Sequence, residues 1–136
     1  LEHIPADEYL DVVQALWKSL TPNGLFVVEV PYGAHDMAWE NPTHVRAFFP
    51  ASFGFMSQPF YWREDYGYRG DFKTESIEIN VPVGLWEDDI KLVHAQTMQL
   101  RNYATVMRGY LRAVKPARAT DRELQESPPI IYVPEV

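Results

Sequence analysis

The strongest structural signal in the chain is the apolar run Leu25-Phe26-Val27-Val28-Glu29-Val30, which directly follows the turn sequence Thr21-Pro22-Asn23-Gly24. The run is nearly all apolar, and its residues are mostly β-branched or aromatic. This composition predicts a β-strand that is covered on both faces, as in the centre of a parallel sheet. The Pro and Gly of the turn end the preceding element before the strand begins.

A helix is predicted before this turn, over residues 6–20. Pro5 and the carboxylates of Asp7 and Glu8 suit the first turn of a helix, where the helix dipole is positive. Apolar residues then recur at helical spacing and form one face. These residues are Leu10, Val13, Leu16, Trp17 and Leu20.

Three further elements are predicted after the strand. Alternation over residues 72–83 predicts a second strand, with Ile77, Ile79, Val81 and Val83 on one side. A helix is predicted over 86–103, with Ile90, Val93, Thr97 and Leu100 on one face, and a strand over 105–114. The predicted order is helix, strand, strand, helix, strand, and this mixture of elements agrees with an α/β fold.

The last residues differ in composition from the rest. Residues 116–136 are rich in proline and carry the charged step Asp121-Arg122-Glu123, which predicts an extended C-terminal tail after a domain formed by residues 1–115. The apolar run Ile130-Ile131-Tyr132-Val133 within the tail predicts packing on the body of the protein or on a neighbouring subunit.

Composition restricts the classes of partner. The 136 residues carry a net charge of −7, which argues against nucleic acid and favours a small molecule, a sugar or a protein. No apolar run approaches the roughly 18 residues that a membrane helix needs, and residues 1–5 do not form a signal peptide. The absence of cysteine excludes disulfides, thiolate zinc sites and a cysteine nucleophile, and it fits a cytoplasmic location.

Four segments occur in an order that suggests a known family. They are Leu1-Glu2-His3-Ile4, Leu20-Thr21-Pro22-Asn23-Gly24, the strand 25–30, and Asn41-Pro42-Thr43-His44-Val45-Arg46-Ala47-Phe48-Phe49. This order resembles the C-terminal half of a class I (Rossmann-like) S-adenosylmethionine-dependent methyltransferase. The resemblance implies a mixed sheet closed by an antiparallel strand pair, here 72–83 and 105–114. The glycine-rich cofactor loop of that family has no counterpart in residues 1–136 and would lie before Leu1.

The resemblance implies a cofactor site at the first residues of the chain. Leu1, Glu2 and His3 would border S-adenosylmethionine, because ligands of open α/β sheets collect at the carboxyl ends of strands. The alternative is that Glu2 caps the following helix and that His3 packs against it.

Residues 32–46 would overhang the acceptor. His44 is the candidate catalytic base, since an imidazole can take a proton from an acceptor hydroxyl or amine, and Arg46 would hold a carboxylate or phosphate. Alternatively, both side chains bond loop carbonyls and hold the turn after Pro42. Most aromatic residues of this region are predicted to be core, with Tyr32 and Trp39 as exceptions that contact the acceptor.

The same loop carries residues of metal-ligand type. His35, Asp36, Glu40 and His44 are residues of ligand type, but their spacing matches no compact metal motif. A solvated polar loop is the better interpretation, and no metal is predicted. The chain also has no Walker loop, no Gly-x-Ser-x-Gly and no His-Glu-x-x-His, so hydrolase and nucleotidase functions lack support.

The resulting functional prediction is methyl transfer from S-adenosylmethionine to a small-molecule or sugar-type acceptor. The alternative is a non-catalytic binding or structural subunit that retains the half-fold. A sheet that ends at the strand 25–30 would expose an edge, and exposed edges pair with other strands. We therefore predict a homo-oligomer, or a partner subunit that completes the sheet.

Overall fold

The protein has a mixed α/β fold built on one four-stranded mixed sheet. The computed structural model describes all residues, 1–136. Its helices are α1 (Tyr9–Ser19) and α2 (Ile90–Gln99), and its strands are β1 (Leu25–Pro31), β2 (Phe72–Pro82), β3 (Val106–Ala113) and β4 (Ile130–Glu135). Short 3-10 segments complete the fold: η1 (Asp36–Ala38), η2 (Pro50–Met56), η3 (Gln58–Trp62), η4 (Val83–Leu85) and η5 (Arg122–Leu124).

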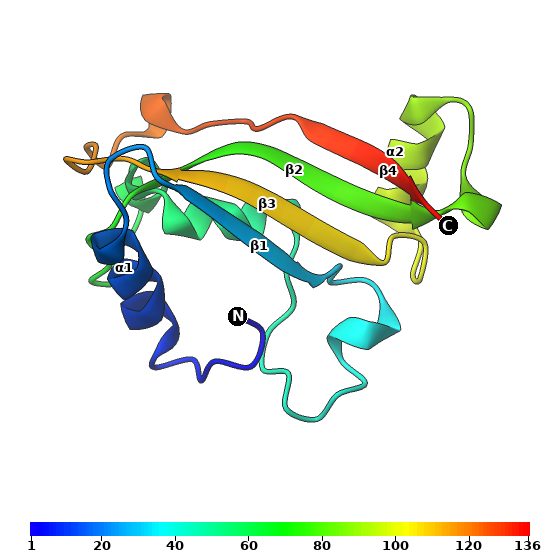
Figure 1. Ribbon diagram of the computed structural model, residues 1–136, viewed down its shortest axis with the longest axis horizontal. Coiled ribbons are helices and arrows are strands. Elements are labelled where there is room, and N and C mark those ends of the chain that lie inside the picture. Colours follow the sequence, from blue (N-terminus) through cyan, green and yellow to red (C-terminus); the bar gives the residue numbers. More distant parts are fainter.

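The strands lie in the order β1-β3-β2-β4 (Figure 1). β3 is antiparallel to both of its neighbours, so β1 and β2 run in the same direction. The register places Arg108 of β3 between Glu29 of β1 and Glu78 of β2, and its guanidinium forms ion pairs with both carboxylates. The antiparallel strand pair that the sequence predicts over 72–83 and 105–114 is therefore present, as β2 and β3.

The position of β1 corrects the prediction of a strand covered on both faces. β1 lies at the edge of the sheet and pairs only with β3, in antiparallel orientation. Val28 and Val30 are buried, whereas Leu25 and Val27 are 44% and 45% exposed. An apolar run looks the same in sequence whether or not a second layer covers it, and here only one face is covered.

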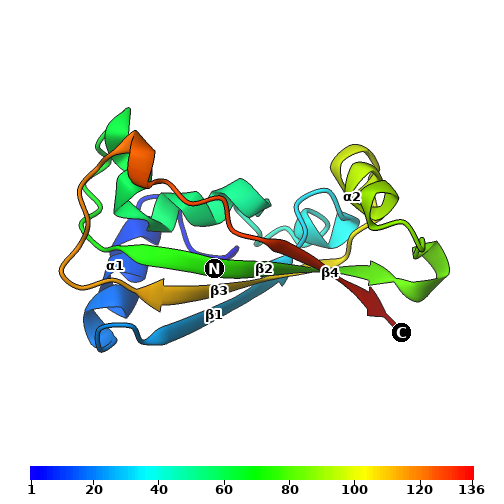
Figure 2. The same cartoon turned by 90° about the horizontal axis from the view of Figure 1, so that it is seen from above.

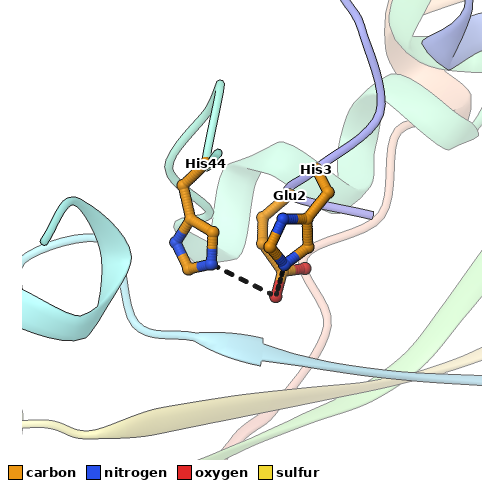
Figure 3. Close-up of side chains that lie close together, drawn as sticks. All are labelled: Glu2, His3 and His44. Atoms are coloured by element: carbon orange, nitrogen blue, oxygen red, sulfur yellow. Dashed lines mark ion pairs between the residues drawn. The ribbon is translucent and has the colours of Figure 1, made fainter. Parts of the chain in front are cut away.

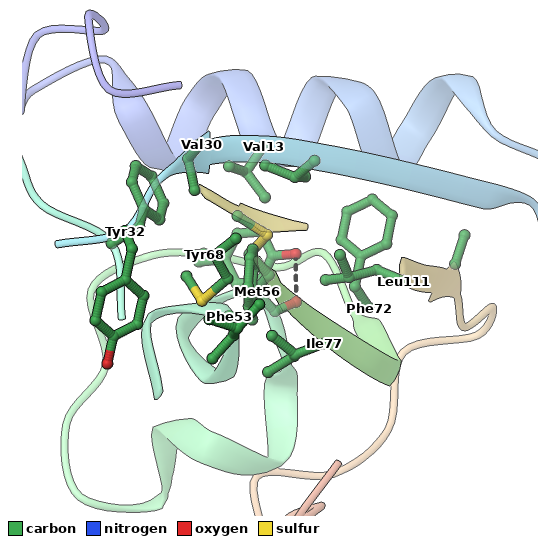
Figure 4. Close-up of a cluster of buried hydrophobic side chains, with 14 of the residues drawn as sticks. Val13, Val30, Tyr32, Phe53, Met56, Tyr68, Phe72, Ile77 and Leu111 are labelled. Carbon is green, nitrogen blue, oxygen red and sulfur yellow. Dashed lines mark hydrogen bonds between the residues drawn. The ribbon is translucent and has the colours of Figure 1, made fainter. Parts of the chain in front are cut away.

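The covered face of the sheet holds the hydrophobic core (Figure 4). Sixteen buried residues form the main cluster, among them Val30 of β1, Met107 and Leu111 of β3 and Ile77 of β2. The short helices of residues 50–62 and helix α2 lie on the same side of the sheet (Figure 2). Val13 of α1 reaches this cluster from the N-terminal helix.

The alternation predicted for β2 holds only in its second half. Ile77, Ile79 and Val81 are buried as predicted, whereas Val83 lies in η4 after the end of β2 and is exposed. The pairing register with β3 shifts between Thr74 and Ser76. A bulge of this kind changes which positions face the core. Phe72 and Thr74, at even positions before the bulge, are therefore buried on the same face as Ile77, at an odd position after it.

Both α-helices are shorter than predicted. α1 begins at Tyr9 instead of residue 6, and α2 covers Ile90–Gln99 within the predicted 86–103. In α2 only Val93 and Thr97 of the predicted face are buried, whereas Ile90 and Leu100 are exposed. No helix of the chain combines the length and the apolar character that a membrane crossing requires.

The C-terminal segment packs on the body of its own chain. β4 extends the sheet by pairing in parallel with β2, and Ile130 faces Ile77 in the register. Residues 116–129, which precede it, are mostly irregular, with one 3-10 turn at η5. The apolar run within 130–133 therefore finds its partner in the same molecule, one of the two placements that the sequence predicted.

Candidate functional site

Backbone hydrogen bonds bring three distant segments together at the carboxyl end of β1. The amide of Gly33, just after β1, donates to the carbonyl of Phe48 at 2.8 Å, and Tyr32 and Phe48 form a parallel bridge. Three residues before Phe48, the amide of Val45 donates to the carbonyl of Glu2 at 2.8 Å. The loop 41–48 is thus held between the end of β1 and the first residues of the chain.

This arrangement gathers the side chains of Glu2, His3 and His44 (Figure 3). One ligand atom from each residue lies within 4.8 Å of the others. Glu2 Oε1 is 3.8 Å from His3 Nε2 and 4.0 Å from His44 Nε2. The imidazole rings meet edge to face, with centroids 4.5 Å apart. The side chain of His44 is 7% exposed and that of Glu2 17%, whereas that of His3 is 52% exposed.

The hydrogen bonds of the two histidines define their neutral tautomers. His44 Nδ1 lies 2.9 Å from the carbonyl oxygen of Ala38, which can only accept, so Nδ1 carries the proton. His3 Nδ1 lies 2.8 Å from Thr43 Oγ1, whose single hydroxyl proton goes to Asn41. Thr43 must therefore accept from His3 Nδ1. In both neutral rings the lone pair is on Nε2, the atom that faces Glu2.

Glu2 is ionised at neutral pH in this environment. Burial raises the pKa of its carboxyl, but hydrogen bonds from its own backbone N–H and from the Leu1 amino group outweigh burial, and the pKa lies below its ordinary value. The Leu1 nitrogen binds Oε2 at 3.1 Å, which leaves Oε1 toward the histidines. Glu2 does not cap helix α1, whose N-cap is Glu8.

Arg46 binds a backbone carbonyl, as its structural alternative expects, but that carbonyl belongs to Leu1 and not to the loop after Pro42. Its guanidinium donates to the carbonyl of Leu1 at 2.6 Å and lies over the ring of Tyr9, 4.2 Å from the centroid. The side chain thus fastens the first residue of the chain to the loop 41–48. A role for Arg46 in acceptor binding stays a prediction.

The two aromatic residues predicted to contact an acceptor differ in exposure. Tyr32 is 2% exposed and belongs to the main core cluster, so it is not the exception to core packing that the sequence predicted. It follows β1 directly and takes the next inward position of that strand. Trp39 is 58% exposed, as expected for a residue that contacts a ligand.

Trp39 lines a groove between the loop after β1 and the end of α2. The groove has a volume of about 720 Å³, and Met98 and Arg101 contribute to its opposite side. Trp39 follows Ala38, whose carbonyl binds His44, so the groove and the Glu2–His3–His44 cluster share the η1 turn. Both lie near the end of strand β1.

The four ligand-type residues considered from sequence do not converge. Asp36 is bound by Arg101 and Asn102, and His35 Nδ1 accepts from the amide of Met37 at the start of η1. His44 instead meets Glu2 and His3. Sequence spacing could not reveal this cluster, because its members come from segments that only the fold brings together.

Comparison with family models, with curated proteins and with solved structures gave no match to this chain.

Proposed function

We propose that residues 1–136 form the C-terminal half of a methyltransferase domain that moves a methyl group from S-adenosylmethionine to a small-molecule or sugar-type acceptor in the cytoplasm. The main support is the position of β3, antiparallel between two strands that are parallel to each other. This is the closing strand pair that the resemblance of the sequence implies. Glu2 and His3 support the proposal further, because they lie at the carboxyl end of β1 beside His44.

The residues of the site suit the chemistry of methyl transfer. Displacement at a sulfonium is in line, so the alignment of acceptor and methyl group supplies most of the rate enhancement. His44 Nε2 has a lone pair and is held by the Ala38 carbonyl, so it can accept the proton of an acceptor hydroxyl or amine. Trp39 offers an exposed aromatic face in the adjoining groove for the acceptor.

Calorimetric titration of the chain with S-adenosylmethionine and S-adenosylhomocysteine tests this proposal. Because the sequence holds no glycine-rich loop, a complete cleft requires further strands beside β1, and the native mass is measured on the same sample. We expect binding by an assembly larger than 15.8 kDa, weakened by Glu2→Gln and unchanged by Glu40→Gln. A 15.8 kDa species without cofactor binding would count against catalysis by this chain.

A second candidate function is assembly without catalysis, as a binding or structural subunit. The observation that favours it is the free edge of β1, beside the exposed side chains of Leu25 and Val27. An unprotected edge strand with apolar neighbours is a template for another strand. A larger native mass without affinity for either cofactor form would favour this function over methyl transfer.

A further inference from the structure

We propose that Glu2, His3 and His44 bind a divalent transition-metal ion of the Zn²⁺ type. This inference goes beyond the proposed function and rests on the geometry of the cluster alone. Two imidazole nitrogens and one carboxylate are a ligand set that suits Zn²⁺ and its first-row neighbours better than Mg²⁺, which prefers oxygen ligands. Three protein ligands leave coordination positions open for water or for a ligand.

The two histidines are already held as metal ligands are. In metal sites the second ring nitrogen usually donates to a carbonyl, a carboxylate or another oxygen, which fixes the tautomer and the ring orientation. His44 Nδ1 donates to the carbonyl of Ala38, and His3 Nδ1 donates to Thr43 Oγ1. Both Nε2 lone pairs are consequently directed to the space beside Glu2 Oε1.

The distances fit a site that closes around an ion. Separations of 3.8 and 4.0 Å between Glu2 Oε1 and the two Nε2 atoms are too long for hydrogen bonds. Two ligands on one ion, with bonds of about 2.1 Å, lie roughly 3.0–3.5 Å apart. Each Glu2–histidine pair must therefore contract by about half an ångström. The exposed ring of His3 can move toward Glu2 Oε1, whereas the pair with the buried His44 closes by a shift of the Glu2 carboxylate toward His44 Nε2.

Metal binding and a base role of His44 exclude each other. An ion would occupy the Nε2 lone pair of His44, and the same atom could not then accept a proton. A bound ion instead lowers the pKa of water or of a hydroxyl at its open position, which provides a different route to a deprotonated acceptor.

The test is titration of the metal-free chain with ZnCl₂, CoCl₂ and MgCl₂ in separate experiments, followed by calorimetry, by thermal unfolding and, for Co²⁺, by its visible absorption. The variants are Glu2→Gln, His3→Gln and His44→Gln. His94→Gln is the matched control, because His94 is exposed and contacts Tyr132 in another part of the molecule.

The amino group of Leu1 requires a control of its own. A free amino terminus followed by His3 is a chelator of Cu²⁺ and Ni²⁺, so these two ions are not used. The chain is also titrated with a short Gly-Ser extension before Leu1, which removes the free amine from the site but keeps the three proposed ligands.

We expect one Zn²⁺ or Co²⁺ per chain, weaker binding of Mg²⁺, and a rise in Tm on addition of Zn²⁺. His3→Gln, which changes an exposed side chain and should fold normally, should weaken Zn²⁺ binding at least about tenfold and abolish the rise in Tm. His94→Gln and the extended chain should behave as the parent. Undiminished binding by His3→Gln, loss of binding on extension, or preference for Mg²⁺ would each overturn the proposal.

Discussion

Arg118 forms an ion pair with the fully buried carboxylate of Asp71. The guanidinium donates from Nε to Oδ2 at 2.8 Å and from Nη2 to Oδ1 at 2.9 Å, and the amide of Arg118 adds a third bond at 2.8 Å. Burial lowers the pKa of Arg118, but hydrogen bonds to Asp71 and Glu126 outweigh burial, and the pKa is raised. This pair fastens the C-terminal segment to the start of β2.

Arg118→Ala should lower the free energy of unfolding by about 3–5 kcal/mol, because it leaves the Asp71 carboxylate buried without its partner. Urea denaturation measures the change. Arg112→Ala is the control, since Arg112 pairs with Glu75 at the surface and such pairs contribute about 1 kcal/mol or less. Equal losses of unfolding free energy in the two variants would show that the buried Arg118–Asp71 pair stabilises the protein no more than a surface pair does.

Gly109 of β3 provides a test of the core. A Cβ atom at this position would lie 2.8 Å from the ring of Phe53, closer than packed atoms approach. Gly109→Ala should therefore cost about 1–3 kcal/mol by overpacking, measured by urea denaturation. Gly84→Ala, where a Cβ atom meets nothing within 4 Å, should cost far less. If steric overlap is the cause, Phe53→Leu should reduce the cost of Gly109→Ala.

Ionisation of Tyr9 lowers the stability of the folded state at alkaline pH. Burial raises its pKa from 10.0 to about 12, although the charge of Arg46 acts in the opposite direction. The folded state then holds the Tyr9 proton more tightly than the unfolded state does. The contribution of Tyr9 to the free energy of unfolding is therefore complete below pH 10 and is lost as pH rises toward 12. Tyr9→Phe should make the loss of stability between pH 8 and pH 11 smaller by about 1.4 kcal/mol. Identical pH profiles of the two proteins would contradict this assignment.

The free edge of β1 predicts how the chain assembles. Val27→Lys places a charge beside that edge, where Val27 is 45% exposed, and should return an assembled chain to 15.8 kDa without unfolding it. Ile131→Lys is the matched control on β4, at 48% exposure, and should leave the mass unchanged. Analytical ultracentrifugation separates the outcomes, and assembly that persists in Val27→Lys would rule out the β1 edge.

The elements were predictable because their signals are local. Alternation identified β2, and helical spacing identified α1 and α2. The bounds of β2, β3, α1 and α2 lie within the predicted ranges, and β1 extends one residue beyond its range, to Pro31. The bulge between Thr74 and Ser76 was not predicted, because the alternation was followed only over residues 76–83, although the apolar positions change from even at Phe72 to odd at Ile77.

The candidate site was predictable only in part. The sequence identifies Glu2, His3 and His44 as candidate site residues but does not predict their contact, and it places Tyr32 on a ligand surface although Tyr32 is buried. Exposure of an aromatic residue after a strand depends on what covers it, and that depends on residues distant in the chain.

The sequence by itself determined the order of helices and strands, the turn at 21–24 and the apolar residues available for a core, because backbone propensity and side-chain periodicity act over a few neighbouring residues. The tertiary structure alone decided that β1 is an edge strand, that Arg118 binds Asp71, and that His44 meets Glu2 and His3. Contacts of this kind depend on how the layers pack, since a side chain's partners are set by the balance of burial and hydrogen bonding across the whole chain.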